Sequence, residues 1–333
     1  MTNAKPATLS TRTLGAGVFM HRVLFLLVAL VGCSTPPPAP PLGSTEDLGP
    51  GPVAETSPDL PGVTVTLLEA GSPPLRRLRY QPVMGREEVL RVTETPDIRH
   101  SGTDGTKRHG TEPTEHLVRL TPRGRRDGYL VRYDVTLEMT DERPPDGEAA
   151  AWDALHKGTA EGHASDRGLS KDLNPRLARI PDADAAAAVR MTWIGVEGLR
   201  VPFPEEDVGI GARWAVVDRF SHYGAESERT RTWTLVALEG DAGRVSYIEE
   251  HTITDPEMRV RRMPKGTRAT LDSFEYAGQG ELDFDLRWFT ATGQEHGELH
   301  SRYHAEIPGT VRYDYRTDGT SDVRWERGGT SEP

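Results

Sequence analysis

The chain has 333 residues, of which 27% are charged and 35% hydrophobic, and its formal net charge is −11 at pH 7. This acidic balance argues against nucleic acid as a partner and against electrostatic adhesion to anionic lipid, because both need clustered lysines and arginines. The single cysteine, Cys33, excludes an intramolecular disulfide, so the folded part must be stabilised by a hydrophobic core.

The first predicted element is a secretory signal in residues 1–32. Nine apolar residues, VLFLLVALV, run from Val23 to Val31 and follow the basic pair His21-Arg22. A membrane-spanning helix needs about 20 apolar residues, so this run is too short to span a bilayer but suits the apolar centre of a signal. Because the stretch before the basic pair is long for a signal, we expect translation to start at Met20.

The end of the signal, Leu30-Val31-Gly32-Cys33, resembles the lipobox of bacterial lipoproteins. The resemblance implies that diacylglycerol is attached to the Cys33 sulfur, that the signal is cut before this residue and that the new amino terminus is acylated. Several acyl chains hold a protein on a bilayer, since each buried methylene contributes about 0.8 kcal/mol. Ser34, where inner-membrane lipoproteins carry aspartate, favours the outer membrane of a Gram-negative cell envelope. The alternative is an ordinary cleaved signal with an incidental cysteine.

Residues 33–61 are predicted to form a lipidated tether. Nine prolines lie between residues 34 and 61, and large apolar side chains are scarce there. Such a segment cannot bury enough surface to offset the entropy lost on ordering it. An extended proline-rich chain of this length reaches up to about 85 Å. A packed irregular arm is the alternative.

The folded part is predicted to consist mainly of β-strands. Apolar and polar residues alternate in YLVRYDVTLEM (129–139), and LDFDLRW (282–288) and LHSRYHAEI (299–307) repeat the pattern. Period-two alternation places one face of a strand on a core and the other in water, and it is typical of antiparallel sheets. The fold class is therefore expected to be α+β, mostly β, and not a doubly wound parallel sheet.

One helix is predicted at residues 182–194, where Asp182 and Asp184 precede the run AAAAVRM. Alanine is the best helix former, and acidic residues at the start suit the free amides and the helix dipole. A weaker helix is predicted for EAAAWDALH, residues 148–156.

Three segments recur in the same order at a spacing of about 120 residues. The pairs are 85–95 with 211–220, 117–131 with 235–247 and 158–168 with 278–288. We therefore expect two copies of one β-rich module, at 62–198 and 199–307, linked by the alanine-rich helix. The alternative is a chance likeness between two β-meanders. Residues 308–333 are predicted to form a C-terminal hairpin and tail, because Asp318-Gly319 is a hairpin-turn sequence.

The order of lipobox, proline-rich tether, β-meander, helix and the segment VPFPEEDVGIGARW (201–214) resembles uncharacterised bacterial lipoproteins. Their second half begins with Pro, acidic residues and Val-Gly-x-Gly-x-x-Trp, which correspond here to Pro204 through Trp214. The resemblance implies a curved half-barrel like that of periplasmic lipoprotein and lipid carriers. It carries no established activity.

The best candidate for chemistry is HGELHSRYH, residues 296–304. His296, Glu298, His300 and His304 share one face of a strand, and imidazole and carboxylate are suitable zinc ligands. That face lies opposite Leu299, so a solvated polar face is the simpler interpretation. The spacing also differs from the HExxH zinc motif.

Other templates give no catalytic site. The sequence contains neither a G-x-S-x-G elbow nor a phosphate-binding loop. Asp283 and Asp285 are expected to be solvated, and the basic clusters 76–79 and 259–265 to be surface charge, although the second is suited to an acidic partner. Four tryptophans are expected in the core: Trp193, Trp214, Trp233 and Trp288.

The leading hypothesis is a non-enzymatic lipoprotein without cofactor, anchored to the envelope membrane through Cys33. Its curved sheet is expected to bind an apolar ligand or a protein partner, and a concavity filled by tryptophan and phenylalanine would count against the ligand. Two alternatives remain open. One is a structural or envelope-assembly component without a small ligand, and the other is a metal-dependent hydrolase that uses His296, His300 and His304.

Overall fold

A computed structural model describes residues 62–102, 105–109, 112–127, 129–143, 149–176, 192–193, 196, 198–222, 225–258, 266–306 and 312–328. Several predictions concern residues outside these ranges: the signal 1–32, the lipidation site Cys33, the tether, residues 182–191 of the predicted helix and the basic cluster 259–265.

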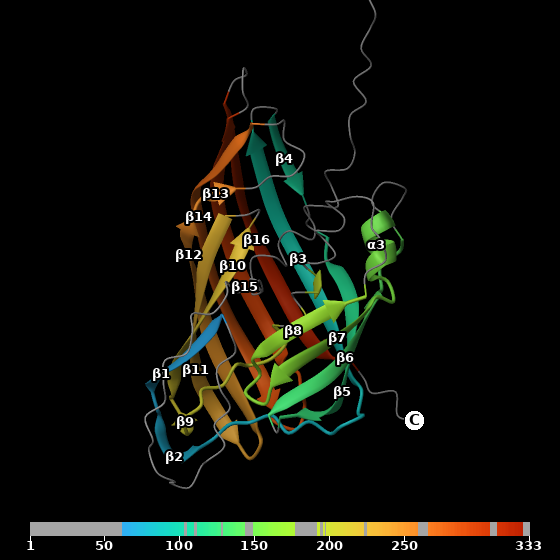
Figure 1. The fold of residues 1–333 in the computed structure, drawn as a ribbon, viewed down its shortest axis with the longest axis vertical. Coiled ribbons are helices and arrows are strands. Elements are labelled where there is room, and N and C mark those ends of the chain that lie inside the picture. Colours follow the sequence, from blue (N-terminus) through green and yellow to red (C-terminus); the bar gives the residue numbers. More distant parts are fainter. Residues whose placement is uncertain are drawn as a thin grey trace, which may run out of the picture.

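The described part contains strands and one short helix, which Figure 1 labels in chain order. The first half consists of β1 (Val63–Glu69), β2 (Ser72–Arg76), β3 (Glu88–Gly102), β4 (Gly105–His109), β5 (Thr114–Arg126), β6 (Leu130–Met139), α3 (Ala149–Leu155), β7 (Thr159–Ser165) and β8 (Ser170–Pro175). The second half consists of β9 (Val208–Ile210), β10 (Arg213–His222), β11 (Ala225–Glu239), β12 (Ala242–Asp255), β13 (Glu257–Met258), β14 (Arg268–Asp285), β15 (Thr292–Glu306) and β16 (Tyr313–Arg327).

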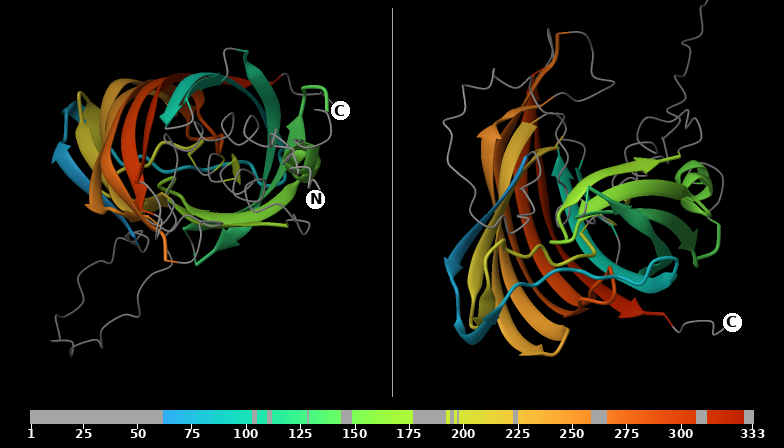
Figure 2. Two further views of the ribbon diagram at one scale, coloured as in Figure 1. Left: turned by 90° about the horizontal axis from the view of Figure 1, so that it is seen from above. Right: turned by 60° about the horizontal axis from the view of Figure 1, so that its bottom comes forward.

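Most strands belong to one antiparallel sheet of 14 strands, in the order β1-β10-β11-β12-β14-β15-β16-β3-β5-β6-β7-β8. β4 and β13 pair at its margin, and β2 and β9 form a separate small sheet. Strands β3 to β8, in teal and green, bend round to face β14 to β16, in orange and red (Figure 2). The two end strands of the 14-stranded sheet, β1 and β8, do not pair with each other in the described residues, so the sheet is curved but open. The predicted mostly β class with curved antiparallel sheets is confirmed.

The strands follow the alternation in the sequence. In β6, Val131, Tyr133, Val135 and Leu137 are buried, whereas Arg132 between them is exposed. The weaker helix predicted at 148–156 is confirmed as α3, and residues 192–193 of the longer predicted helix are helical.

The paired segments of the predicted repeat form strands in the same order, β3-β5-β6-β7 and β10-β11-β12-β14. The β5–β6 and β11–β12 hairpins each contain a register shift, between Pro122 and Gly124 and between Leu235 and Ala237. Strands of the two predicted modules nevertheless belong to one continuous sheet, because β1 pairs with β10 and β16 joins β15 to β3. A duplication stays a prediction.

The predicted C-terminal hairpin is wrong. β16 is one strand of 15 residues, and Asp318-Gly319 lies in its middle, where Gly319 is opposite Leu299 on β15 and Ile98 on β3. Buried residues have the same parity on both sides of this dipeptide, at Thr317 before it and at Ser321, Val323 and Trp325 after it. Asp-Gly favours a turn only locally, and two neighbouring strands that pair along β16 outweigh that preference.

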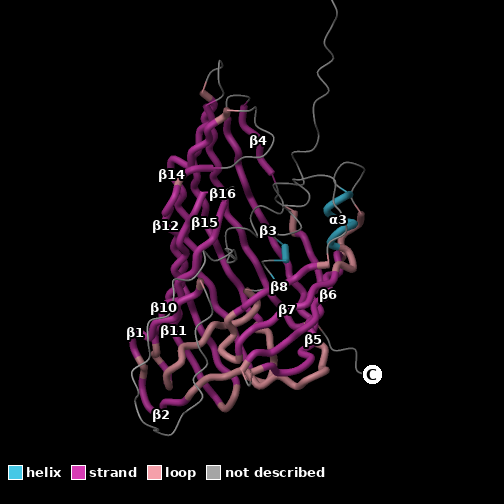
Figure 3. The backbone as a smooth tube through the Cα atoms, viewed as in Figure 1, coloured by secondary structure: helices cyan, strands magenta, loops and turns pink. Residues whose placement is uncertain are grey.

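Large aromatic side chains fill the concave side of the sheet. Its fully buried residues include Trp193, Trp214, Trp233, Tyr80, Tyr133, Phe203 and Phe289. Phe203 comes from the loop 198–207 and packs against Phe284 and Trp214, with ring centroids 5.0 and 6.4 Å away. Loops, drawn in pink, cross the lower end of the fold beside the strands (Figure 3).

The segment 201–214 has a structural role in the described fold. The Trp214 indole N–H donates to the Pro202 carbonyl at 2.7 Å. A Cβ on Gly209 would lie 2.0 Å from the Ser72 carbonyl oxygen, so only glycine permits the approach of β2 to β9. The segment 201–214 therefore joins the loop 198–207, which we call the core loop, to the small sheet of β2 and β9.

Candidate functional site

The three candidate histidines of β15 are not brought together. His296 Nδ1 lies 2.8 Å from Asp322, His300 Nδ1 lies 2.9 Å from Asp318, and His304 Nδ1 lies 2.8 Å from Asp272. Each histidine thus binds a different aspartate on a neighbouring strand. No group of three histidine, cysteine, aspartate or glutamate residues in the described ranges is arranged to hold a metal ion.

The aspartate pair and the first basic cluster are also occupied by local ion pairs. Asp283 contacts Arg244 at 2.7 Å and Asp285 contacts Arg287 at 2.6 Å. In the cluster 76–79, however, Arg79 is not simple surface charge. Its guanidinium donates to Glu205 at 2.6 Å and to the Pro204 carbonyl at 3.0 Å, and it clamps the core loop.

Three of the four tryptophans are in the core as expected, but the prediction for Trp288 is wrong. Its ring is partly exposed and lies between two guanidinium groups, Arg86 at 3.4 Å and Arg327 at 4.0 Å from the ring centroid. Strand β14 ends at Asp285, so the alternation that predicted burial no longer applies three residues later. Cation–π contact with both faces of the ring takes the place of burial.

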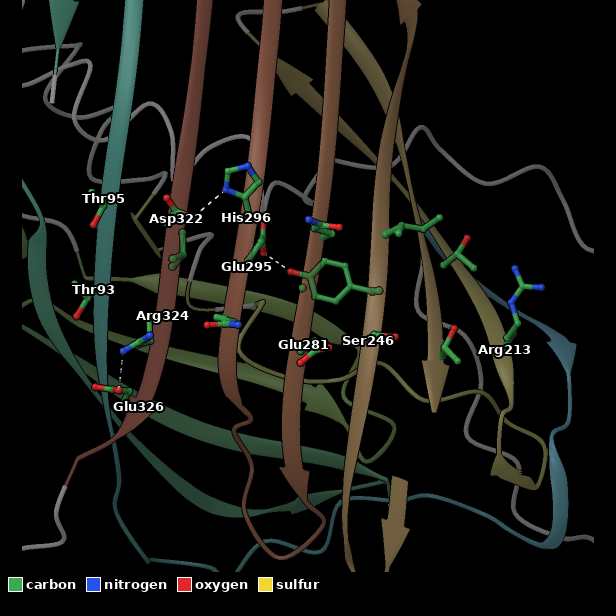
Figure 4. Close-up of a pocket in the computed structure, with 18 residues that line it drawn as sticks. Thr93, Thr95, Arg213, Ser246, Glu281, Glu295, His296, Asp322, Arg324 and Glu326 are labelled. Atoms are coloured by element: carbon green, nitrogen blue, oxygen red, sulfur yellow. Dashed lines mark hydrogen bonds and ion pairs between the residues drawn. The ribbon is translucent and has the colours of Figure 1, made fainter. Parts of the chain in front are cut away.

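A groove of about 950 Å³ lies on the face of the sheet opposite the packed interior. In β11 and β12 lining residues such as Thr232 and Ile248 alternate with buried ones such as Arg231 and Val245. Three buried residues, Tyr247, Glu295 and Val323, also contribute to the lining. Figure 4 shows the groove extending from Arg213 on β10 across to β3. Its uncharged polar lining consists of Thr93, Thr95, Thr232, Thr234, Ser246, Gln279 and Gln294.

Two charged pairs lie within the groove. His296 and Asp322 form the hydrogen bond described above, and this bond is the main reason that the pKa of His296 is raised. Arg324 contacts Glu326 at 3.6 Å. Ile248 supplies an aliphatic surface among these polar groups, with 54% of its surface exposed. A floor of hydroxyl, amide and paired charged groups suits a polar, extended ligand better than an apolar one.

The carboxylate of Glu295, a buried residue that also contributes to the groove lining, is held between two tyrosines. The hydroxyl of Tyr276 donates to it at 3.0 Å, and the hydroxyl of Tyr247 donates to its other oxygen. Glycines make room for both rings: a Cβ on Gly280 would lie 2.5 Å from the Tyr247 ring, and one on Gly297 would lie 2.3 Å from the Tyr276 hydroxyl. Burial, followed by the negative charge of Glu249, raises the pKa of Glu295 to about 7.

Glu249 is the second buried carboxylate of this cluster, and its state differs. The Arg231 guanidinium donates to it, and His251 Nε2 lies 2.6 Å from its other oxygen. Burial is the largest influence on Glu249 and would raise its pKa, but the positive charges of Arg231 and Arg229 and the contact with His251 together outweigh burial and lower the pKa to about 2. The same burial lowers the pKa of His251, whose ring stacks on Phe274.

The concave face offers little free space beside this cluster. A cavity of about 10 Å³ lies between Arg231, Trp233, Tyr247, Glu295 and Trp325. That volume holds about one water molecule and no organic substrate. The small cavity therefore cannot hold a ligand, and the groove, whose lining includes Glu295, is the site accessible to a partner.

The buried acid cluster could have been found from the sequence. In SERTRTWTL, Arg229 and Arg231 have the same parity as Trp233, which places them on the buried face. The glycines of YAGQGEL likewise indicate that a large ring covers the strand. A charged residue in phase with core residues is the signal that sequence reasoning missed.

No protein-family model matches the chain, and no curated protein sequence matches it. Among solved structures, the chain is similar to the crystal structure of the outer membrane protein opdK from Pseudomonas aeruginosa, at 7% identity and a TM-score of 0.17. That comparison covers 72% of this chain and 99% of the other, and a score this low carries no argument about fold or function. Among the described helical residues, no stretch is both long and apolar enough to cross a bilayer.

Proposed function

We propose that this chain is a lipid-anchored, non-enzymatic protein of the cell envelope that binds a polar segment of a protein partner. The observation that supports this proposal is the groove of about 950 Å³ on the solvent-facing side of the sheet. Its threonine, serine and glutamine side chains offer hydrogen-bond donors and acceptors to a polar segment. Ile248 offers an apolar contact within it.

The filled interior argues against the apolar-ligand form of the hypothesis. Trp214, Trp233, Phe203 and Phe284 occupy the concavity in which such a ligand would lie. The pairing of each candidate histidine with a separate aspartate likewise argues against a metal-dependent hydrolase. A protein partner on the outer face is compatible with both findings.

The anchor is tested by labelling bacteria that express the full chain with radioactive palmitate. We expect label in the protein and its loss in the Cys33→Ser variant, which should leave the membrane fraction. Unlabelled protein, or unchanged fractionation of Cys33→Ser, would contradict the anchor.

The groove is tested by photo-crosslinking in cells. A photoreactive amino acid at Ile248 is expected to give a discrete adduct, and one at Val83, which is equally exposed in the loop before β3, is not. Thr232→Arg together with Gln279→Arg should fill the groove and abolish the adduct. Lipidated protein without an adduct at Ile248 would favour a structural role without a groove partner.

A further inference from the structure

Four aliphatic side chains lie exposed together at the lower end of the fold, and we call them the aliphatic tip. They are Leu68, Leu75, Ile210 and Val236, with 49%, 43%, 49% and 48% of their surface exposed. They belong to β1, β2, β9 and β11, whose lower ends meet in Figure 1. Single exposed aliphatic residues are ordinary on a protein surface, but a group of them marks a contact surface.

Two of these residues continue the outward parity of their strands. Leu68 follows the exposed Thr66 at a spacing of two in β1, and Val236 follows Thr234 in the same way in β11. Alternate residues of a strand share one face, so both aliphatic groups lie on the face opposite the buried residues. Both also lie at register shifts, of β1 on β10 and of β11 on β12.

The small sheet adds the other two residues. Ile210 pairs with Ser72, and a Leu75 methyl carbon lies 3.0 Å from the position that a Cβ on Gly209 would take. The amide of Gly211 donates to the Leu235 carbonyl at 2.8 Å, which ties the small sheet to β11 beside Val236. Leu75, Ile210 and Val236 therefore lie on connected backbone, and β1, which carries Leu68, joins it through its pairing with β10.

The charges around the tip are paired. Arg76 contacts Asp241 at 3.5 Å, Arg77 contacts Asp207 at 3.4 Å, and Arg213 contacts Glu69 at 2.9 Å. These three ion pairs, which form the rim of the tip, therefore favour neither an acidic nor a basic partner. An apolar surface with a neutral rim fits a phospholipid interface through burial of its aliphatic groups.

We propose that the aliphatic tip rests on the bilayer that carries the acyl chains of Cys33, an inference that depends on the proposed lipid anchor. Residues 34–61 connect the anchor to Gly62, which directly precedes β1, the strand that carries Leu68. With a reach of up to about 85 Å, this segment lets the tip meet the membrane. Tethering provides an effective concentration on the order of 1 mM, so a patch too weak to bind vesicles alone docks once anchored.

The single cysteine makes a direct experiment possible. In the lipidated full chain the Cys33 sulfur is alkylated, so one introduced cysteine carries the only free thiol. Val236→Cys and, as matched control, Ile248→Cys are labelled with an environment-sensitive fluorophore and reconstituted on phosphatidylcholine vesicles that contain a quencher-bearing lipid. Ile248 is as exposed as Val236 but lies in the groove.

We expect blue-shifted emission and at least threefold stronger lipid quenching at Val236 than at Ile248. Adding Leu68→Ser and Ile210→Ser should remove the difference while the thermal unfolding curve keeps its midpoint. Vesicle-bound protein whose two probes respond alike would overturn the docking of the tip and leave the anchor intact. Protein that lacks lipid and stays off the vesicles would overturn both.

Discussion

Replacing Glu295 by glutamine should stabilise the protein above neutral pH, although it removes a buried, doubly hydrogen-bonded carboxylate. Only 4% of Glu295 is exposed, and its pKa is raised to about 7 from an ordinary value of 4.5. Between these two values the unfolded chain has lost the proton that the folded chain keeps. Stability from this group is therefore complete below pH 4.5 and declines as pH rises to 7.

The difference between the two pKa values corresponds to about 3 kcal/mol of unfolding free energy that is lost above pH 7. Glutamine has the shape of the protonated acid and its carbonyl accepts from one tyrosine, while its amide donates to the other. Glu295→Gln should thus match the wild type within about 1 kcal/mol at pH 5 and exceed it by about 2–3 kcal/mol at pH 8.

Glu249→Gln is the matched control, since it is the same substitution in the same cluster. It leaves the Arg231 guanidinium, 8% exposed, without its carboxylate. Removing one partner of a buried ion pair costs about 3–5 kcal/mol, so this variant should be destabilised at both pH values.

Urea unfolding of both variants and the wild type, in the Cys33→Ser background, measures these free energies at pH 5 and pH 8. The reasoning would be refuted by a Glu295→Gln variant that is less stable than wild type at pH 8. A pH dependence unchanged from wild type would refute it equally.

Three further predictions concern other parts of the described fold. Gly280→Ala should cost about 1–3 kcal/mol because its Cβ meets the Tyr247 ring, whereas Gly124→Ala, where nothing lies within 4 Å, should change stability by less than about 0.5 kcal/mol in the same urea assay. Asp322→Asn removes the main cause of the raised pKa of His296, so NMR titration should show a lower pKa for this histidine. An unchanged pKa would show that the hydrogen bond between His296 and Asp322 does not form in solution. A chain ended after residue 312 lacks β16 and should be digested by protease under conditions that leave the full chain intact; a resistant core of both halves would contradict the observed strand order.

The strands were predictable where one face is buried and the other solvated. Val131 to Leu137 and Leu282 to Phe284 alternate as expected, because burial on one side imposes a period of two. The same reasoning placed His300 and His304 on the polar face, and each hydrogen-bonds to an aspartate on a neighbouring strand there.

Predictions from local sequence failed where a distant partner decides. Asp318-Gly319 has the composition of a turn, yet pairing with β3, more than two hundred residues earlier, keeps it extended. Trp288 lies between Arg86 and Arg327, and no pattern around residue 288 reveals either contact. The groove was equally unpredictable, since its lining comes from seven strands whose order depends on β16.

The position of β16 imposes an order on biogenesis. Among the described strands β16 comes after all others in the chain, and in the described sheet it is the strand that joins the β10–β15 meander to the β3–β8 meander. Until residues 313–327 have left the ribosome, both meanders present an open edge that can pair with another chain. The two meanders are therefore exposed to aggregation for as long as β16 is missing.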